Sequence, residues 1–184
     1  MKKIIILIAL ILSATTLIHA QGKMALGING GVALPLGDFG DGFDMGFGGN
    51  AIFIYHTSPN SDVTVTVGYL TWSGKDSSDL TFSSIPVMVG GKYLFGKGKF
   101  NPYINGELGV HFATAETPEY VINGQTYGGS VSDTYFGWGA GGGFLYKLGQ
   151  NMNLDFNVRY NGIASEGNSS NYVSILVGLL FGLK

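Results

Sequence analysis

The chain has 184 residues, of which 45% are hydrophobic and 12% are charged, and its formal net charge is −2 at pH 7. It has no cysteine, which excludes a disulfide scaffold, a cysteine-ligated metal centre and a thiol nucleophile. No basic excess is available to neutralise phosphates, so nucleic acid is excluded as a partner.

The first twenty residues are typical of a secretory signal peptide. Residues 1–3 form a short positive start, residues 4–12 are an unbroken apolar run, and Ala20 suits the last position before a cleavage site. The run is short for a membrane anchor, because a spanning helix needs about 20 apolar residues. We therefore expect a cleaved signal peptide over residues 1–20 and one domain over residues 21–184.

The rest of the chain has apolar residues at every second position, which is the period of a β-strand. The clearest case is the run from Asp62 to Tyr69, where valines alternate with threonines. No segment has the pattern of an amphipathic helix. Eight strands are predicted, near residues 24–33, 45–56, 63–72, 82–95, 102–113, 134–148, 152–162 and 172–183.

The connections between these strands alternate in length. The long ones are polar or glycine-rich and lie near residues 34–44, 73–81, 114–133 and 163–171. The short ones resemble tight turns and lie near residues 57–62, 96–101 and 149–151. An even number of strands with such connections is typical of an up-and-down meander, with both termini on the side of the short turns.

The two faces of the predicted strands differ in polarity. One face carries Val, Ile, Leu and aromatic residues with almost no charge, and the runs reach the roughly 9–11 residues that a strand needs to span a bilayer. The other face carries a few polar residues of both signs among glycines: Lys92, Asn105, Glu107, His111, Asp155, Asn157 and Arg159. Because a membrane barrel has its apolar face outward, we expect an all-β, eight-stranded antiparallel up-and-down transmembrane β-barrel with these seven residues as a lumenal polar network. The alternative is a soluble periplasmic or secreted β-barrel that binds a small apolar ligand.

Aromatic residues gather near the predicted strand ends, as in the interfacial girdles of membrane barrels. The residues assigned to such girdles are Tyr55, Tyr69, Trp72, Tyr93, Tyr103, Trp138 and Tyr146. Glycines fall on one face of a single strand, at residues 137, 139, 141 and 143. Placed inward, they would make room for long polar side chains in the narrow lumen of an eight-stranded barrel.

Four segments together resemble the small outer-membrane β-barrel proteins, that is, the OmpA-type transmembrane barrel and its OmpX-like relatives. They are residues 31–39 (GVALPLGDF), 85–95 (IPVMVGGKYLF), 101–109 (NPYINGELG) and 153–160 (NLDFNVRY). The resemblance implies a barrel in the outer membrane of a Gram-negative-type bacterium, with both termini periplasmic. It also implies contact with outer-membrane lipid and lipopolysaccharide, and insertion by the barrel assembly machinery.

The expected function is non-enzymatic: a structural or surface-interaction role, with at most a narrow, non-specific pore. A second alternative is a lipid A-modifying barrel enzyme, for which the mature histidines His56 and His111 are the candidate residues. His56 falls at a short turn, and no serine is evidently paired with His111. The sequence therefore predicts no catalytic residue.

The long loops are the places where recognition residues are expected. Asp38, Asp41 and Asp44 lie in one of them, but their spacing is not that of an EF-hand calcium loop, so we interpret them as solvated acids and expect no metal or cofactor. An extracellular ligand could bind through residues 34–44 and 114–133. A closed barrel has no free sheet edge, so a monomer is expected.

Overall fold

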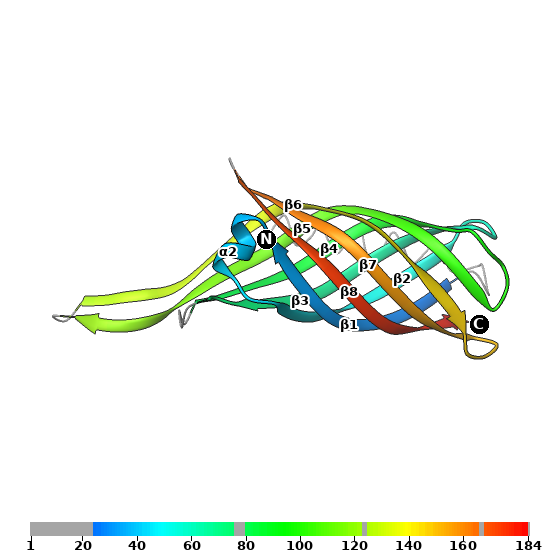
Figure 1. Ribbon diagram of the computed structural model, residues 1–184, viewed down its shortest axis with the longest axis horizontal. Coiled ribbons are helices and arrows are strands. Elements are labelled where there is room, and N and C mark those ends of the chain that lie inside the picture. Colours follow the sequence, from blue (N-terminus) through cyan, green and yellow to red (C-terminus); the bar gives the residue numbers. More distant parts are fainter. Residues whose placement is uncertain (1–23, 76–79, 123–124, 166–167, 184) are drawn as a thin grey trace, which may run out of the picture.

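A computed structural model describes residues 24–75, 80–122, 125–165 and 168–183 as a closed β-barrel (Figure 1). The expected signal peptide, residues 1–20, lies outside the described residues. Each strand pairs antiparallel with the next, and β1 pairs with β8 to close the sheet. The strands are β1 (Met24–Leu36), β2 (Gly46–His56), β3 (Ser61–Ser73), β4 (Thr81–Leu94), β5 (Phe100–Ile122), β6 (Gln125–Lys147), β7 (Met152–Ser165) and β8 (Asn168–Leu183).

The alternation of side chains confirms the predicted inversion of polarity. On β3, Val63, Val65 and Val67 are between 38% and 45% exposed, whereas Asp62 and Thr64 are 5% exposed or less. An exposed apolar wall around a polar interior is the pattern of a barrel in lipid, where a closed sheet satisfies every backbone group. The alternative of a soluble barrel with an apolar ligand cavity is therefore wrong.

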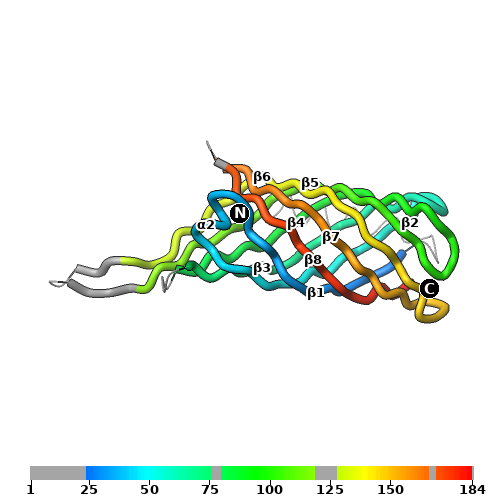
Figure 2. Tube along the Cα trace, viewed as in Figure 1, coloured from blue at the N-terminus to red at the C-terminus, as the bar shows by residue number. Residues whose placement is uncertain are grey.

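The short connections lie at one end of the barrel and the long ones at the other, which we call the turn end and the loop end (Figure 2). Met24 pairs with Leu183, so the first and last described strands begin and end at the turn end. In the described part of the chain, no helix has the length and apolar character needed to cross a membrane, a finding that concerns helices alone.

The loop end is more regular than the sequence predicts. Residues 114–133 were expected to form a loop, but β5 and β6 run through most of this segment and stay paired as far as Ile122 and Gln125. Most of the expected loop 163–171 likewise belongs to β7 and β8. The expected loop 34–44 contains a single helical turn, α2 (Asp38–Gly42).

The glycine face of β6 points into the lumen, as predicted. A Cβ atom on Gly137 would meet the ring of His111, and one on Gly139 would meet the side chains of Asn161 and Arg159. The absence of side chains on this face therefore leaves the space that the long polar residues of neighbouring strands occupy.

Candidate functional site: the barrel lumen

An aromatic cluster closes the loop end of the lumen. Its centre is Trp72, which is 1% exposed. Trp72 meets the ring of Phe39 edge-on, with centroids 5.3 Å apart, and that of Tyr172 at 5.2 Å. The Trp72 Nε1–H group donates a hydrogen bond to the carbonyl oxygen of Ala33, at 3.0 Å. We call this cluster the plug; its buried members are Ala33, Phe39, Leu70, Trp72, Ile163 and Tyr172.

The helical turn α2 carries Phe39 into the plug and is tied to the β3 side of the mouth. The Lys75 ammonium donates to the carbonyl oxygen of Gly40 at 2.5 Å, and the Lys75 backbone N–H donates to Gly42 at 3.0 Å. The Asp44 N–H donates to the carbonyl oxygen of Ser73 at 2.9 Å. These bonds place α2 as a cap over the mouth of the barrel.

A second apolar cluster closes the turn end. Its buried members are Ala25, Ile54, Tyr103, Leu145 and Leu180. Both ends of the interior are therefore apolar, and the polar residues predicted for the lumen lie between them.

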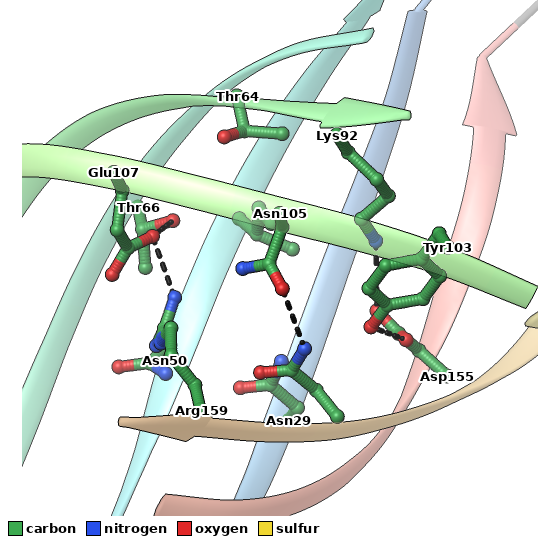
Figure 3. Close-up of a pocket in the computed structure, with 12 residues that line it drawn as sticks. Asn29, Asn50, Thr64, Thr66, Lys92, Tyr103, Asn105, Glu107, Asp155 and Arg159 are labelled. Carbon is green, nitrogen blue, oxygen red and sulfur yellow. Dashed lines mark hydrogen bonds and ion pairs between the residues drawn. The ribbon is translucent and has the colours of Figure 1, made fainter. Parts of the chain in front are cut away.

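Near the turn-end cluster, Asp155 receives two donors (Figure 3). The Lys92 ammonium lies 3.2 Å from Asp155 Oδ2, and the Tyr103 hydroxyl donates to Asp155 Oδ1 at 2.5 Å. The Lys92 ammonium also lies 4.0 Å from the centre of the Tyr103 ring. Both charged side chains are only 3% exposed, so the pair is shielded from bulk solvent.

One layer closer to the loop end, Arg159 and Glu107 form the second buried ion pair. Arg159 Nη1 lies 2.6 Å from Glu107 Oε2, with side-chain exposures of 9% and 5%. Thr66 donates a hydrogen bond to the same carboxylate at 3.4 Å. Between the two ion pairs, Asn157 donates to Asn105 at 3.1 Å. Among the described residues, the part of the lumen between the two apolar clusters thus holds these two cations and two anions in separate, neutral pairs.

The space left in this polar layer is small. Two cavities lie along it, with volumes of about 20 Å³ and about 10 Å³. A cavity of about 10–15 Å³ holds one water molecule. The described residues therefore leave room for isolated water molecules between the two apolar clusters, and not for a continuous water column.

His111 has a serine partner that the sequence analysis missed. Ser84 Oγ lies 2.9 Å from His111 Nδ1, and both residues are at most 1% exposed. The contact joins β4 and β5 diagonally, because Ser84 pairs with Ala113 and His111 pairs with Pro86. A substrate has no access to this pair, since the plug lies above it and only the smaller cavity adjoins it.

His56 lies at the turn end, as predicted, and is bonded to Asp62 across the β2–β3 pair. His56 Nδ1 is 2.6 Å from Asp62 Oδ1. A cavity of about 250 Å³ adjoins both residues and is otherwise walled mainly by apolar and amide side chains. The two candidate histidines therefore lie in different parts of the barrel and do not form a joint site.

Two of the seven aromatic residues assigned to girdles were placed wrongly. Trp72 belongs to the plug, and Tyr103, which is 3% exposed, contacts Lys92 and Asp155 in the lumen. Trp72 has the same parity as Asp62 along β3, and Tyr103 has the same parity as Glu107 along β5, so both must point inward. The other five residues have outward parity and are exposed or half-buried: Tyr55, Tyr69, Tyr93, Trp138 and Tyr146.

The acids of the first long loop do not assemble into a metal site. Asp38 and Asp41 lie in α2, and Asp44 follows it. Among residues 24–75, 80–122, 125–165 and 168–183, no three His, Asp or Glu side chains are grouped so that they could hold a metal ion.

Both a sequence-family model and solved structures match this chain. A family model, described as the outer membrane protein beta-barrel domain, matches residues 4–181. The crystal structure of Neisserial surface protein A (NspA) is similar, with a TM-score of 0.64 at 19% identity, covering 87% of this chain and 97% of that one. No protein with a curated functional description matches in sequence.

The attachment invasion locus protein of Yersinia pestis, Ail, is a second structural neighbour. Its crystal structure matches with a TM-score of 0.60 at 17% identity, covering 88% of this chain and 100% of that one. A further Ail structure, in complex with the heparin analogue sucrose octasulfate, matches with a TM-score of 0.56 at 19% identity, covering 88% and 99%. At these identities the likeness concerns the fold alone.

Proposed function

Because the chain belongs to the outer membrane protein beta-barrel domain family, and so is a bacterial outer-membrane protein, we propose that it is a non-enzymatic barrel with a surface-interaction role. The observation that carries this proposal is the extension of β5 and β6 beyond the barrel (Figure 1). We further propose that the turn end faces the periplasm and that the loop end, with this extension, faces the cell exterior.

The extension, which we call the arm, consists of residues 117–122 and 125–135. The β4–β5 pairing ends at Glu116, and the β6–β7 pairing begins at Phe136. Beyond these points, the described parts of β5 and β6 pair only with each other. Free strand edges expose unpaired backbone groups, onto which an extended polypeptide can add as a further strand. The arm is therefore suited to binding protein partners.

The acidic residues of the loop end favour some classes of binding partner over others. The arm and its flanking residue Glu116 contain three carboxylates, Glu116, Glu119 and Asp133, and no lysine or arginine. The α2 helix adds Asp38 and Asp41, and Asp44 follows it. We propose that the partner is an extended, neutral or basic polypeptide segment, and that a sulfated polyanion such as the one bound by Ail is a poor ligand for this chain.

The proposal is tested by removing the part of the arm that lies beyond the Glu116–Ser130 pair. Glu116 and Ser130 are paired across β5 and β6, so Asn-Gly in place of residues 117–129 would close a two-residue hairpin at this point. Cells displaying this variant are expected to lose adherence to immobilised extracellular-matrix proteins. The variant should still migrate differently on SDS gels before and after heating, which reports a folded barrel. Adherence that is equal for the intact and the shortened arm, or absent for the intact protein, would contradict the proposal.

We propose that the intact barrel does not conduct ions at a steady rate. The support is the arrangement of the plug, the two paired charge layers and the turn-end cluster along one axis. Purified protein in planar bilayers is expected to give no stepwise current in concentrated KCl. Regular conductance steps at single-molecule protein density would show that the plug opens and that the barrel is a narrow pore.

A non-enzymatic role is supported by the burial of Ser84 and His111. Lipid A modification needs an accessible nucleophile or base beside the membrane surface, whereas these two side chains are enclosed. The lipid A of cells with and without the protein is therefore expected to have the same mass spectrum.

A further inference from the structure

Three lysines meet at one corner of the turn end, where the β4–β5 turn lies against the end of β6. Lys97 and Lys99 belong to the turn, and Lys147 is the last residue of β6. The Lys147 N–H donates to the carbonyl oxygen of Lys99 at 2.8 Å, and its ammonium lies 3.4 Å from the carbonyl oxygen of Lys97. The Lys99 ammonium lies 5.1 Å from the centre of the Tyr146 ring. We call this group the lysine corner.

The positive charge of the lysine corner is not neutralised by the described residues. All three side chains are exposed, and the ion pairs found in the described ranges involve other residues: His56 with Asp62, Lys92 with Asp155, and Arg159 with Glu107. The described acids outside these pairs are those of α2 and its neighbours, Glu116, Glu119 and Asp133. They belong to the loop end, at the opposite side of the barrel.

Outward-facing aromatic rings adjoin the lysine corner. Phe100, Phe144 and Phe156 form a row across β5, β6 and β7, with centroid distances of 5.0 Å and 5.3 Å. Tyr93 of β4 and Phe95, which follows β4, meet edge-on at 5.3 Å, and Phe95 is 60% exposed. These rings lie at the turn-side border of the apolar wall that faces lipid. The lysines are thus placed at the depth of the lipid headgroups.

We propose that the lysine corner binds the phosphate of an anionic phospholipid in the turn-side leaflet, with the acyl chains lying along the adjoining aromatic rings. Lysine is a point-charge donor for phosphate, and each basic side chain near a charged membrane surface strengthens binding of anionic lipid by about fivefold. The inference rests on the outer-membrane location, and not on the proposed role of the arm.

The test uses the barrel in mixed bilayer nanodiscs of phosphatidylglycerol and phosphatidylcholine, followed by native mass spectrometry of the retained lipids. We expect the intact protein to retain phosphatidylglycerol in preference to phosphatidylcholine. The variant with Lys97→Gln, Lys99→Gln and Lys147→Gln is expected to lose this preference by about tenfold or more. Its heat-dependent shift on SDS gels, which reports a folded barrel, should persist because none of the three side chains is in the lumen.

Two controls decide between the possible outcomes. Lys75→Gln removes one positive charge at the loop end, and it should leave the lipid preference intact. Inorganic phosphate added to the protein in detergent should not raise the unfolding midpoint, because the proposed site needs the lipid surface beside it. Equal retention of both lipids by the intact protein, an unchanged preference in the triple variant, or a lysine-dependent response to phosphate alone would each overturn the proposal.

Discussion

Replacing Arg159 with methionine is expected to lower the free energy of unfolding by about 3–5 kcal/mol, because it leaves the carboxylate of Glu107 buried without its counter-ion. The pair is 2.6 Å apart and at most 9% exposed, and the remaining hydrogen bond from Thr66 does not supply a compensating charge. Equilibrium unfolding in urea, with the protein in lipid vesicles, measures the change. An unchanged midpoint would show that the pair is not required for stability.

A second variant separates the cost of the unpaired Glu107 carboxylate from the loss of the packing contacts of Arg159. In the double variant Glu107→Gln with Arg159→Met, no isolated charge remains, and the amide can still accept the hydrogen bond from Thr66. We expect this variant to recover most of the stability. In vesicles of zwitterionic lipid, where the lysine corner has no anionic ligand, Lys97→Met removes an exposed cation and should change the free energy of unfolding by no more than about 0.5 kcal/mol. A double variant that is no more stable than Arg159→Met would assign the effect to packing instead.

Replacing Trp72 with alanine is expected to cost about 3–5 kcal/mol, the usual loss for a large aromatic side chain removed from a packed core. Trp72 is 1% exposed, contacts Phe39 and Tyr172, and donates a hydrogen bond to Ala33. Trp138 is the matched control, because it lies on the outer surface and is 37% exposed. Trp138→Ala should cause a much smaller loss of stability.

The fluorescence of the two tryptophans also reports whether each ring faces the lipid. The chain has only these two, so Trp72→Phe leaves Trp138 as the single fluorophore, and Trp138→Phe leaves Trp72. In vesicles of brominated lipid, the fluorescence of Trp138 should be quenched strongly and that of Trp72 weakly. Equal quenching of the two would place Trp72 on the lipid-facing surface and contradict the plug.

The alternation of residue types is sufficient to predict the barrel and the four charged residues of its two lumenal ion pairs. Lys92, Glu107, Asp155 and Arg159 are all inside, where strand parity places them. The same parity should have placed Trp72 and Tyr103 inside, but these residues were assigned by their nearness to strand ends. The direction of a side chain along its strand therefore overrides the preference of aromatic residues for the membrane interface.

Other features could not be read from local sequence. The helical turn α2 has five residues, too few for a periodic pattern, and it is held by contacts of Phe39 with residues of β3 and β4. The Ser84–His111 contact depends on the β4–β5 register, which the pattern of one strand does not fix. The arm contains Gly128, Gly129, Ser130 and Ser132, a composition typical of loops, yet its two strands pair with each other.

The pairing of β1 with β8, which closes the barrel, can form only after the last strand has been synthesised. Met24 is the first described residue to leave the ribosome and Leu183 is the last, yet the two lie opposite each other in the finished sheet. Until β8 has been made, β1 has a bare edge, and an open sheet of this kind is not tolerated in hydrocarbon. The chain must therefore travel to its membrane as a complete, unclosed polypeptide. It follows that a truncation within β8 should abolish insertion altogether, rather than yield a seven-stranded remnant.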